Sequence, residues 1–254
     1  MEVLHPRCAG LDVHKRTVVA CARIAQGRQV TREVRTFGTT TNELYQLGDW
    51  LAEQGCTHAA MEATGVYWKP AWFLLEECFE LTLANPGQIR NLPGRKSDVN
   101  DATWIADLLA HGLMRGSFVP PVEIRDLRDL TRTRVQLVQE RSRYVLRIQK
   151  TLEDAHLKLG NVLSDVLGKT GRSILTAVIA GESDPGKLAQ LRREGVKASE
   201  AELVEALRGR VRDHHRVLFQ LLLQQIDRLD AAIQVLETEA SKVLEPFETR
   251  KSSS

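Results

Sequence analysis

The sequence has few cysteines, no leader-like segment and no long hydrophobic run. Its four cysteines in 254 residues form no C-x-x-C pair, which argues against a disulfide framework and favours reduced, packed thiols in a cytosolic protein. The N-terminus lacks the basic, apolar, small-residue order of a signal peptide, and no apolar run approaches the roughly 18 residues of a membrane span. We therefore expect a soluble, cytoplasmic protein that has no membrane partner.

A strong net charge is missing as well. The chain carries 35 Lys and Arg against 33 Asp and Glu, a formal charge of +2, so nucleic-acid binding must be argued from where the charges lie. A disordered chain is excluded, because 43% of the residues are hydrophobic and can form a core. The length suits one large domain or a domain with an extension.

The first part of the chain alternates strand and helix patterns. Three strands are predicted between residues 8 and 37, with turn residues between them, so the sheet should begin as an antiparallel meander. Two later strands, at 57–63 and 81–84, alternate with helical spacing of apolar residues, which indicates βα units and parallel pairing. Pro120-Pro121 then interrupts the pattern. The sequence thus predicts an α/β domain over residues 1–119.

Strand patterns disappear beyond this boundary. Residues 120–250 are predicted to form an all-α, coiled-coil-containing region, with helical periodicity from about 199 to 244 and a disordered tail at 251–254. Strict four-three spacing of apolar residues gives the best coiled-coil pattern: Leu222, Ile226, Leu229, Ile233, Leu236, Ala240 and Val243. Such spacing suits a helical hairpin within one chain as well as a dimerisation arm between two chains, so both alternatives remain open.

Four carboxylates lie at the ends of predicted elements. Asp12 lies at or near the end of the first strand and Glu62 at the end of the fourth, while Asp98 and Asp101 open the helix after the fifth. Ligands of α/β sheets collect outside the carboxyl ends of the strands, so the four side chains can meet at one edge. Because clustered like charges are costly without cations, such a cluster indicates two Mg²⁺ or Mn²⁺ ions roughly 4 Å apart acting on a phosphodiester.

Helix capping is the simpler explanation of the last two carboxylates. Ser97 or Asp98 could cap the helix, and Asp101 is favoured in a first turn by the helix dipole. The carboxylates upstream shift the balance towards a metal site. His14, close to Asp12, is expected to be structural and not a metal ligand, since lone histidines are more often structural.

Three motifs carry a resemblance to a known family. GLDVHK at 10–15, MEATGVYW at 61–68 and GRKSDVNDA at 94–102 resemble those of the DEDD-type insertion-sequence transposases, relatives of the pilin-gene invertase. The specific motifs cover roughly the first 110 residues, and the helical remainder is similar in layout only. The resemblance implies a RuvC-like, ribonuclease-H-like first domain of a DNA transposase or site-specific recombinase. Its metal-holding, catalytic tetrad would be Asp12, Glu62, Asp98 and Asp101.

The resemblance also implies nucleic-acid partners and assembly. Family members use a structured non-coding guide RNA that pairs with DNA. The resemblance also implies a homodimer, joined through the coiled coil and able to form a higher assembly. It places the protein at the nucleoid in the bacterial cytoplasm. The basic residues expected to contact nucleic acid are Arg90, Arg95, Lys96, Arg125, Arg128, Arg132, Arg134, Arg141, Arg143, Arg147 and Lys150. Arginine suits phosphate because its planar fork donates two hydrogen bonds. A solvated helix face is the alternative, since Asp126, Asp129 and Glu140 partly neutralise the run.

The family pattern continues into a C-terminal domain with a serine nucleophile, which this sequence is expected to lack. The chain ends at Ser252-Ser253-Ser254, soon after the coiled-coil pattern, so we expect a truncated protein that is not competent for recombination alone. Two alternatives follow. A RuvC-like, structure-specific endonuclease would use the same two metal ions, and a nucleic-acid-binding fragment would be inactive by itself.

Overall fold

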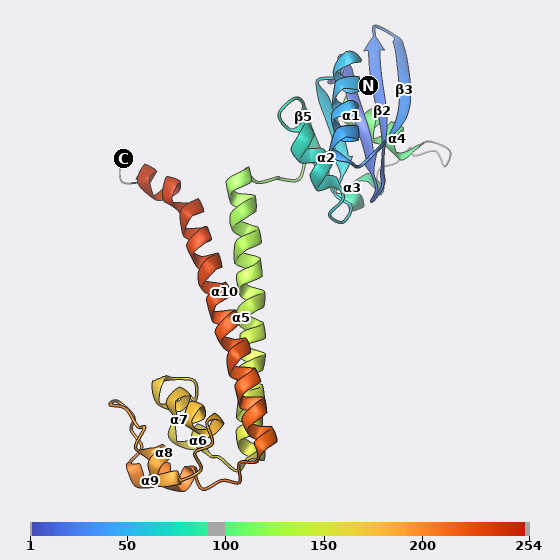
Figure 1. Ribbon diagram of the computed structural model, residues 1–254. Coiled ribbons are helices and arrows are strands. Elements are labelled where there is room, and N and C mark those ends of the chain that lie inside the picture. The colour runs from blue at the N-terminus through green and yellow to red at the C-terminus, as the bar shows by residue number, and fades with distance from the viewer. Residues whose placement is uncertain (1, 91–99, 252–254) are drawn as a thin grey trace. The chain divides into compact units, whose positions relative to one another are not determined.

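The computed structural model describes residues 2–90 and 100–251, and its contacts divide the chain into two compact units (Figure 1). The first unit is Met1–Val119 and the second is Pro120–Ser254. The first is an α/β unit and the second is helical. These two classes confirm the fold classes that the sequence predicts for the two parts.

A mixed five-stranded sheet forms the centre of the first unit. Its strands are β1 Arg7–Val13, β2 Thr17–Gln26, β3 Gln29–Gly38, β4 His58–Glu62 and β5 Glu80–Ala84, in the order β3-β2-β1-β4-β5. The strands β1, β2 and β3 pair antiparallel, as the predicted meander requires. In contrast, β4 is parallel to β1, and β5 is parallel to β4. The carboxyl ends of β1, β4 and β5 therefore lie at one edge of the sheet.

Helices cover both faces of this sheet (Figure 1). They are α1 Thr41–Glu53, α2 Trp68–Leu75, α3 Pro86–Arg90 and α4 Asp101–Ala110. On one face, Leu11 and Met61 of the strands are buried with Leu47 of α1 and residues of α2. On the other face, Ala60 packs with Ile105 of α4. The alternation of side chains along each strand thus separates an α1 face from an α4 face.

The start of α4 differs from the predicted start. Ser97 and Asp98, the expected caps, lie outside the described residues. The described helix begins at Asp101, and the Asn100 side chain caps it by accepting a hydrogen bond of 2.9 Å from the Ala102 amide. Asn, Ser and Asp cap helices about equally well, so residue type could not select among neighbouring candidates.

The second unit is a helical hairpin with a lobe of short helices (Figure 1). The long helices α5 Val122–Asp154 and α10 Asp213–Lys251 pack along each other. The lobe contains α6 Leu159–Val162, α7 Lys169–Ile179, α8 Pro185–Ala189 and α9 Glu200–Ala206. Across the described ranges, no helix has the length and apolarity needed to span a membrane.

Pairing within one chain accounts for part of the predicted coiled-coil pattern. Ile226, Leu229 and Ile233 of α10 are buried in the second unit, so the hairpin alternative describes these residues. The helical pattern predicted to start at about 199 is interrupted between α9 and α10. Gly209 lies between the two helices, so close to Ala155 that a Cβ would meet its carbonyl oxygen at 2.5 Å.

Candidate functional site

Two neighbouring parallel strands bring Asp12 and Glu62 to the same edge of the sheet. Leu11 of β1 pairs with Met61 of β4 in the sheet. Asp12 directly follows Leu11, and Glu62 directly follows Met61. Neighbouring strands lie about 4.8 Å apart, so the two residues leave the sheet side by side. The register therefore shows only that Asp12 and Glu62 lie near the same edge of the sheet.

Both carboxylates lie on the α4 face. Leu11 and Met61 are buried on the α1 face, and alternation directs the next residue of each strand to the opposite face. Gly10 marks how closely α4 approaches there. A Cβ at Gly10 would overlap the carbonyl oxygen of Ala102, so the first turn of α4 lies directly against β1.

Asp101 approaches this edge from a third element. It is the first residue of α4, and it shares one side of the helix with Ile105 and Leu108, four and seven residues later. Ile105 and Leu108 pack with Ala60 of β4 and with β5. Asp101 is therefore on the side of α4 that faces β4, the strand that ends in Glu62.

Neighbouring polar groups hold the two strand carboxylates. The Asp12 Oδ2 atom lies 3.1 Å from His14 Nε2, and the Thr64 hydroxyl donates a hydrogen bond of 3.0 Å to Glu62 Oε1. Asp12 is partly buried, with 23% of its side chain exposed. Gly65, at φ +58°, completes the turn after Glu62. A tight turn at Thr64-Gly65 is what the sequence predicts, but not the contact of Thr64 with Glu62, for which the nearest signal is its position two residues after a candidate ligand.

The described residues alone do not complete a metal site. Within residues 2–90 and 100–251, no group of three or more His, Cys, Asp or Glu side chains is placed to hold a metal ion. Asp98, the fourth predicted ligand, lies outside the described residues. The chemistry of the donor set nevertheless fits a hard divalent cation, because Asp12, Glu62 and Asp101 offer only carboxylate oxygens from three converging elements.

The predicted nucleic-acid residues separate into distinct groups. Arg95 and Lys96 lie outside the described residues, and Arg90 is the last residue of α3. Two others hold the hairpin together. Arg134 Nη2 lies 2.6 Å from Glu237 Oε1, and Arg141 forms an ion pair with Asp230, so both bridge α5 to α10. Their guanidinium groups are thus engaged within the protein.

A basic stripe remains on the exposed surface of α5. It consists of Arg128, Arg132, Arg143 and Lys150, which are exposed and separated by 4, 11 and 7 positions. These separations are close to whole turns of an α-helix, so the four side chains project from one side. The remaining two predicted contacts are on the same helix: Arg125 is half-buried, and Arg147 lies 4.9 Å from the Tyr144 ring centroid.

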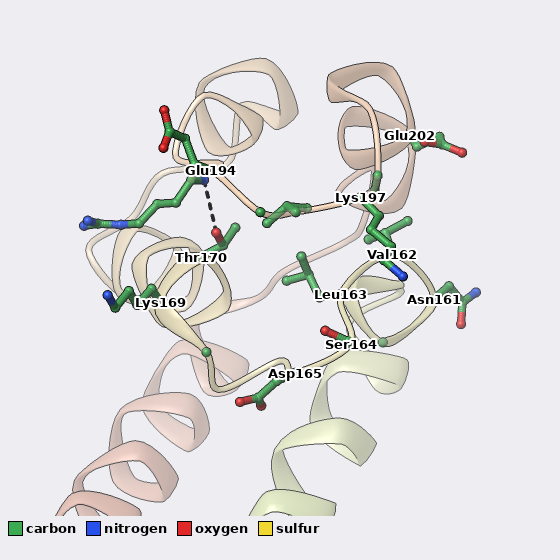
Figure 2. Close-up of a pocket in the computed structure, with 16 residues that line it drawn as sticks. Asn161, Val162, Leu163, Ser164, Asp165, Lys169, Thr170, Glu194, Lys197 and Glu202 are labelled. Atoms are coloured by element: carbon green, nitrogen blue, oxygen red, sulfur yellow. Dashed lines mark hydrogen bonds between the residues drawn. The ribbon is translucent and has the colours of Figure 1, made fainter.

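The lobe contains an open pocket of about 820 Å³ (Figure 2). Its charged lining consists of Asp165, Lys169, Arg193, Glu194, Lys197 and Glu202. Three acidic groups balance three basic groups, and the Thr170 hydroxyl already accepts a hydrogen bond of 3.1 Å from the Arg193 amide. Glu202 is engaged in the capping box of α9. We therefore assign this pocket no ligand.

Comparison with known proteins adds one family match. Residues 9–157, more than half of the chain, match the family model of the DEDD transposases of the IS110 type, described as a transposase. A solved structure of RuvC from Thermus thermophilus is similar at 12% identity and a TM-score of 0.33, over 44% of this chain and 99% of RuvC. No curated protein matches the chain significantly.

Proposed function

The chain belongs to the DEDD transposases of the IS110 type, a family of enzymes that act on DNA, and we propose that its first unit cleaves DNA strands with divalent metal ions. The observation that carries this proposal is the register of β1 and β4. It brings Asp12 and Glu62 out of adjacent parallel strands on one face, beside the start of α4. A RuvC-like, ribonuclease-H-like arrangement of this unit is part of the proposal.

The proposed ligands of two Mg²⁺ or Mn²⁺ ions are Asp12, Glu62, Asp101 and Asp98. Bound divalent ions at such a site stabilise the charge on the attacking and leaving oxygens of a phosphodiester. The chain's own groups prepare the site. Thr64 donates a hydrogen bond to the Glu62 carboxylate, and His14 lies within hydrogen-bond distance of Asp12. Asp101 lies on the side of α4 that packs against β4.

The basic stripe of α5 is the proposed contact with the phosphates of a structured guide RNA. Four cations on one side of a helix can follow a sugar-phosphate backbone, and each contact should add to the salt dependence of binding. Arg90, Arg95, Lys96, Arg125 and Arg147 remain in the proposal as further contacts. Arg134 and Arg141 contribute by holding α5 against α10, in place of the phosphate contacts first expected of them.

A homodimer is the proposed assembly, joined through the hairpin. The buried residues of α10 are used within the chain, so a partner would cover other apolar side chains. Those of α5 and α10 that remain well exposed include Val135, Leu146, Leu221 and Val235, between 50% and 63% exposed. These side chains are the proposed contacts of that interface, which requires them to form one contiguous apolar patch.

A structure-specific endonuclease is the second candidate, because the same carboxylates would support hydrolysis. The two activities differ in their products: recombination conserves the number of phosphodiester bonds, whereas hydrolysis leaves free ends. In the test, the protein is incubated with Mg²⁺, a plasmid that carries the two ends of the insertion sequence, and the RNA encoded at one of those ends. Joined products support the transposase, and nicked plasmid alone supports the endonuclease. RNA binding without any product supports a nucleic-acid-binding fragment that is inactive by itself.

The matched variants for this assay are Asp12→Asn and Asp49→Asn. Asp49 is exposed on α1, at the opposite face of the sheet, so its neutralisation should leave the products unchanged. Asp12→Asn removes a proposed ligand and should abolish both kinds of product. Equal product formation by Asp12→Asn and the unaltered protein would contradict the proposed site.

A further inference from the structure

A buried ion pair joins the sheet to α4 away from the proposed ligands. Arg23 of β2 is 3% exposed, and its Nε donates a hydrogen bond of 2.8 Å to Asp107 Oδ1 on α4. Arg32 of β3 donates to the same oxygen through Nη2, also at 2.8 Å. Two strands therefore hold one carboxylate of the helix that begins with Asp101.

This ion pair is not part of the metal-binding edge. In the pairing of β1 with β2, Arg23 lies opposite Cys8, whereas Asp12 lies opposite Val19, four residues further along β1. At roughly 3.4 Å per residue, the two places are more than 10 Å apart along the strand. Any influence of Arg23 on the carboxylates must therefore act through the position of α4.

The two long sides of α4 face different strands. Asp107 is hydrogen-bonded to Arg23 of β2, so this side of α4 faces β2. Asp101 is on the other side, with Ile105 and Leu108, which pack against β4 and β5. A rotation of α4 that displaced Asp107 relative to β2 would also change the direction of Asp101 relative to Glu62.

Small side chains line the centre of the contact between α4 and the sheet. Ala102 and Ala106 pack with Cys21, and Gly10 allows the helix backbone to lie directly on β1. Such a surface permits close approach but has no bulky side chain to interlock with the helix. A directional interaction is needed to select one rotation, and hydrogen bonds to a charged group are directional.

Stability alone is a poor explanation for the buried pair. Buried ion pairs can often be replaced by apolar residues of similar volume with no loss of stability. Here Arg23 Nη1 is buried and has no hydrogen-bond partner among the described residues, which adds to the cost of burial. Net stability is therefore a weak reason for this pair, whereas holding two elements in one arrangement is a role that apolar packing does not supply.

We propose that Arg23 and Asp107 are positioning residues, which set the rotation of α4 and thereby direct Asp101 towards Asp12 and Glu62. This inference rests on the proposed function, because its consequence is the affinity of the carboxylates for a divalent cation. Residues behind metal ligands typically change metal affinity by 10- to 100-fold when they are replaced. The pair should act in the same range without touching the ion.

The decisive variant replaces both partners by apolar residues, Arg23→Met with Asp107→Leu. Mn²⁺ binding is measured by electron paramagnetic resonance, and the melting temperature and amide exchange of α4 are measured in metal-free protein. We expect an unchanged or raised melting temperature, faster exchange in α4, and affinity for Mn²⁺ about tenfold weaker. Asp107→Glu keeps the carboxylate and should recover most of the affinity.

Two controls separate the possible failures. Leu47→Ala weakens the core under the opposite face of the sheet, so it should lower the melting temperature but keep Mn²⁺ affinity. Asp12→Asn should lose Mn²⁺ binding; if it binds like the unaltered protein, the proposed function is wrong. If Asp12→Asn loses binding while the double variant binds normally, only the positioning role is wrong.

If the double variant does not fold, Arg23→Lys is measured in the same way. This substitution keeps the positive charge but removes the planar guanidinium group.

Discussion

The two units use the same kind of ion pair in different surroundings. In the α/β unit, Arg23 is 3% exposed where it meets Asp107, whereas in the helical unit Arg141 is 34% exposed where it meets Asp230. Both pairs join elements far apart in the sequence. A solvent-exposed ion pair contributes little to stability because water screens its charges. A buried ion pair has few alternative partners and can hold two elements in one arrangement. We therefore expect the loss of an ion pair to destabilise the helical unit less than the α/β unit.

The largest expected effect comes from glycines at close contacts. A Cβ at Gly10 would overlap the backbone of α4, and one at Gly171 would overlap the carbonyl of Val166 in the lobe. We expect Gly10→Ala and Gly171→Ala each to destabilise its own unit by about 3 kcal/mol, because backbone cannot move aside as a side chain can. Gly160→Ala is the control, with nothing within 4 Å.

Tryptophan fluorescence allows the units to be followed separately. All four tryptophans precede Pro120, so fluorescence reports the α/β unit, while far-ultraviolet circular dichroism is dominated by the long helices. Gly10→Ala should shift the fluorescence transition alone. A Gly10→Ala protein that melts like the unaltered one would contradict the described contact between β1 and α4.

Ion-pair truncation should separate the units next. Asp107→Ala leaves a buried guanidinium without its carboxylate and is expected to cost about 3 kcal/mol, whereas Asp230→Ala removes a partly exposed partner and should cost about 1 kcal/mol or less. Urea unfolding measures both changes. Equal costs for the two substitutions would remove the distinction between the buried and the exposed pair.

Alkaline pH should weaken the α/β unit selectively. Burial raises the pKa of the Cys8 thiol to about 12 and that of Cys56 to about 11. The unfolded chain ionises near the ordinary value, so the folded state holds more protons above about pH 9 and its stability falls as pH rises. Fluorescence-detected melting between pH 8 and 11 measures this loss, which Cys8→Ala should reduce.

Acid pH should also lower stability, through a buried histidine. Desolvation lowers the pKa of His215 at the start of α10, so the unfolded state binds more protons below about pH 6.5, and stability is lost as pH falls. His5 shifts in the same direction in the α/β unit, again mainly through desolvation. His215→Gln should therefore flatten only the dichroism-detected decline. His214→Gln should flatten it less, because the charge of His214 lowers the pKa of His215 less than desolvation does.

The smallest expected effects are at helix caps, and they should be equal in the two units. The Thr40 hydroxyl accepts a hydrogen bond from the Glu43 amide, and Ser199 forms a capping box with Glu202. Thr40→Ala and Ser199→Ala should each cost about 1 kcal/mol. Chemical unfolding followed by tryptophan fluorescence and by circular dichroism measures the two losses of stability. A difference of several kcal/mol between them would show that the effect of a cap depends on the unit.

Sequence patterns were sufficient where the structure is decided locally. Alternation located the strands, and Asp12 and Glu62 could be placed near strand ends, where β1 ends one residue after Asp12 and β4 ends at Glu62. The partners of arginines could not be predicted in this way. Arg134 bonds a residue 103 positions away, and Arg23 one 84 positions away, so only the assembled fold separates them from the basic stripe.

A calorimetric titration with Mn²⁺ tests the central claim most directly, namely that β1, β4 and α4 together form a carboxylate metal site. The unaltered protein and the Asp49→Asn control should release equal heats at equal stoichiometry. Asp12→Asn and Glu62→Gln should each abolish binding or weaken it strongly, because each removes a charged oxygen donor from one edge of the sheet. Unchanged stoichiometry and affinity in both variants would contradict the account.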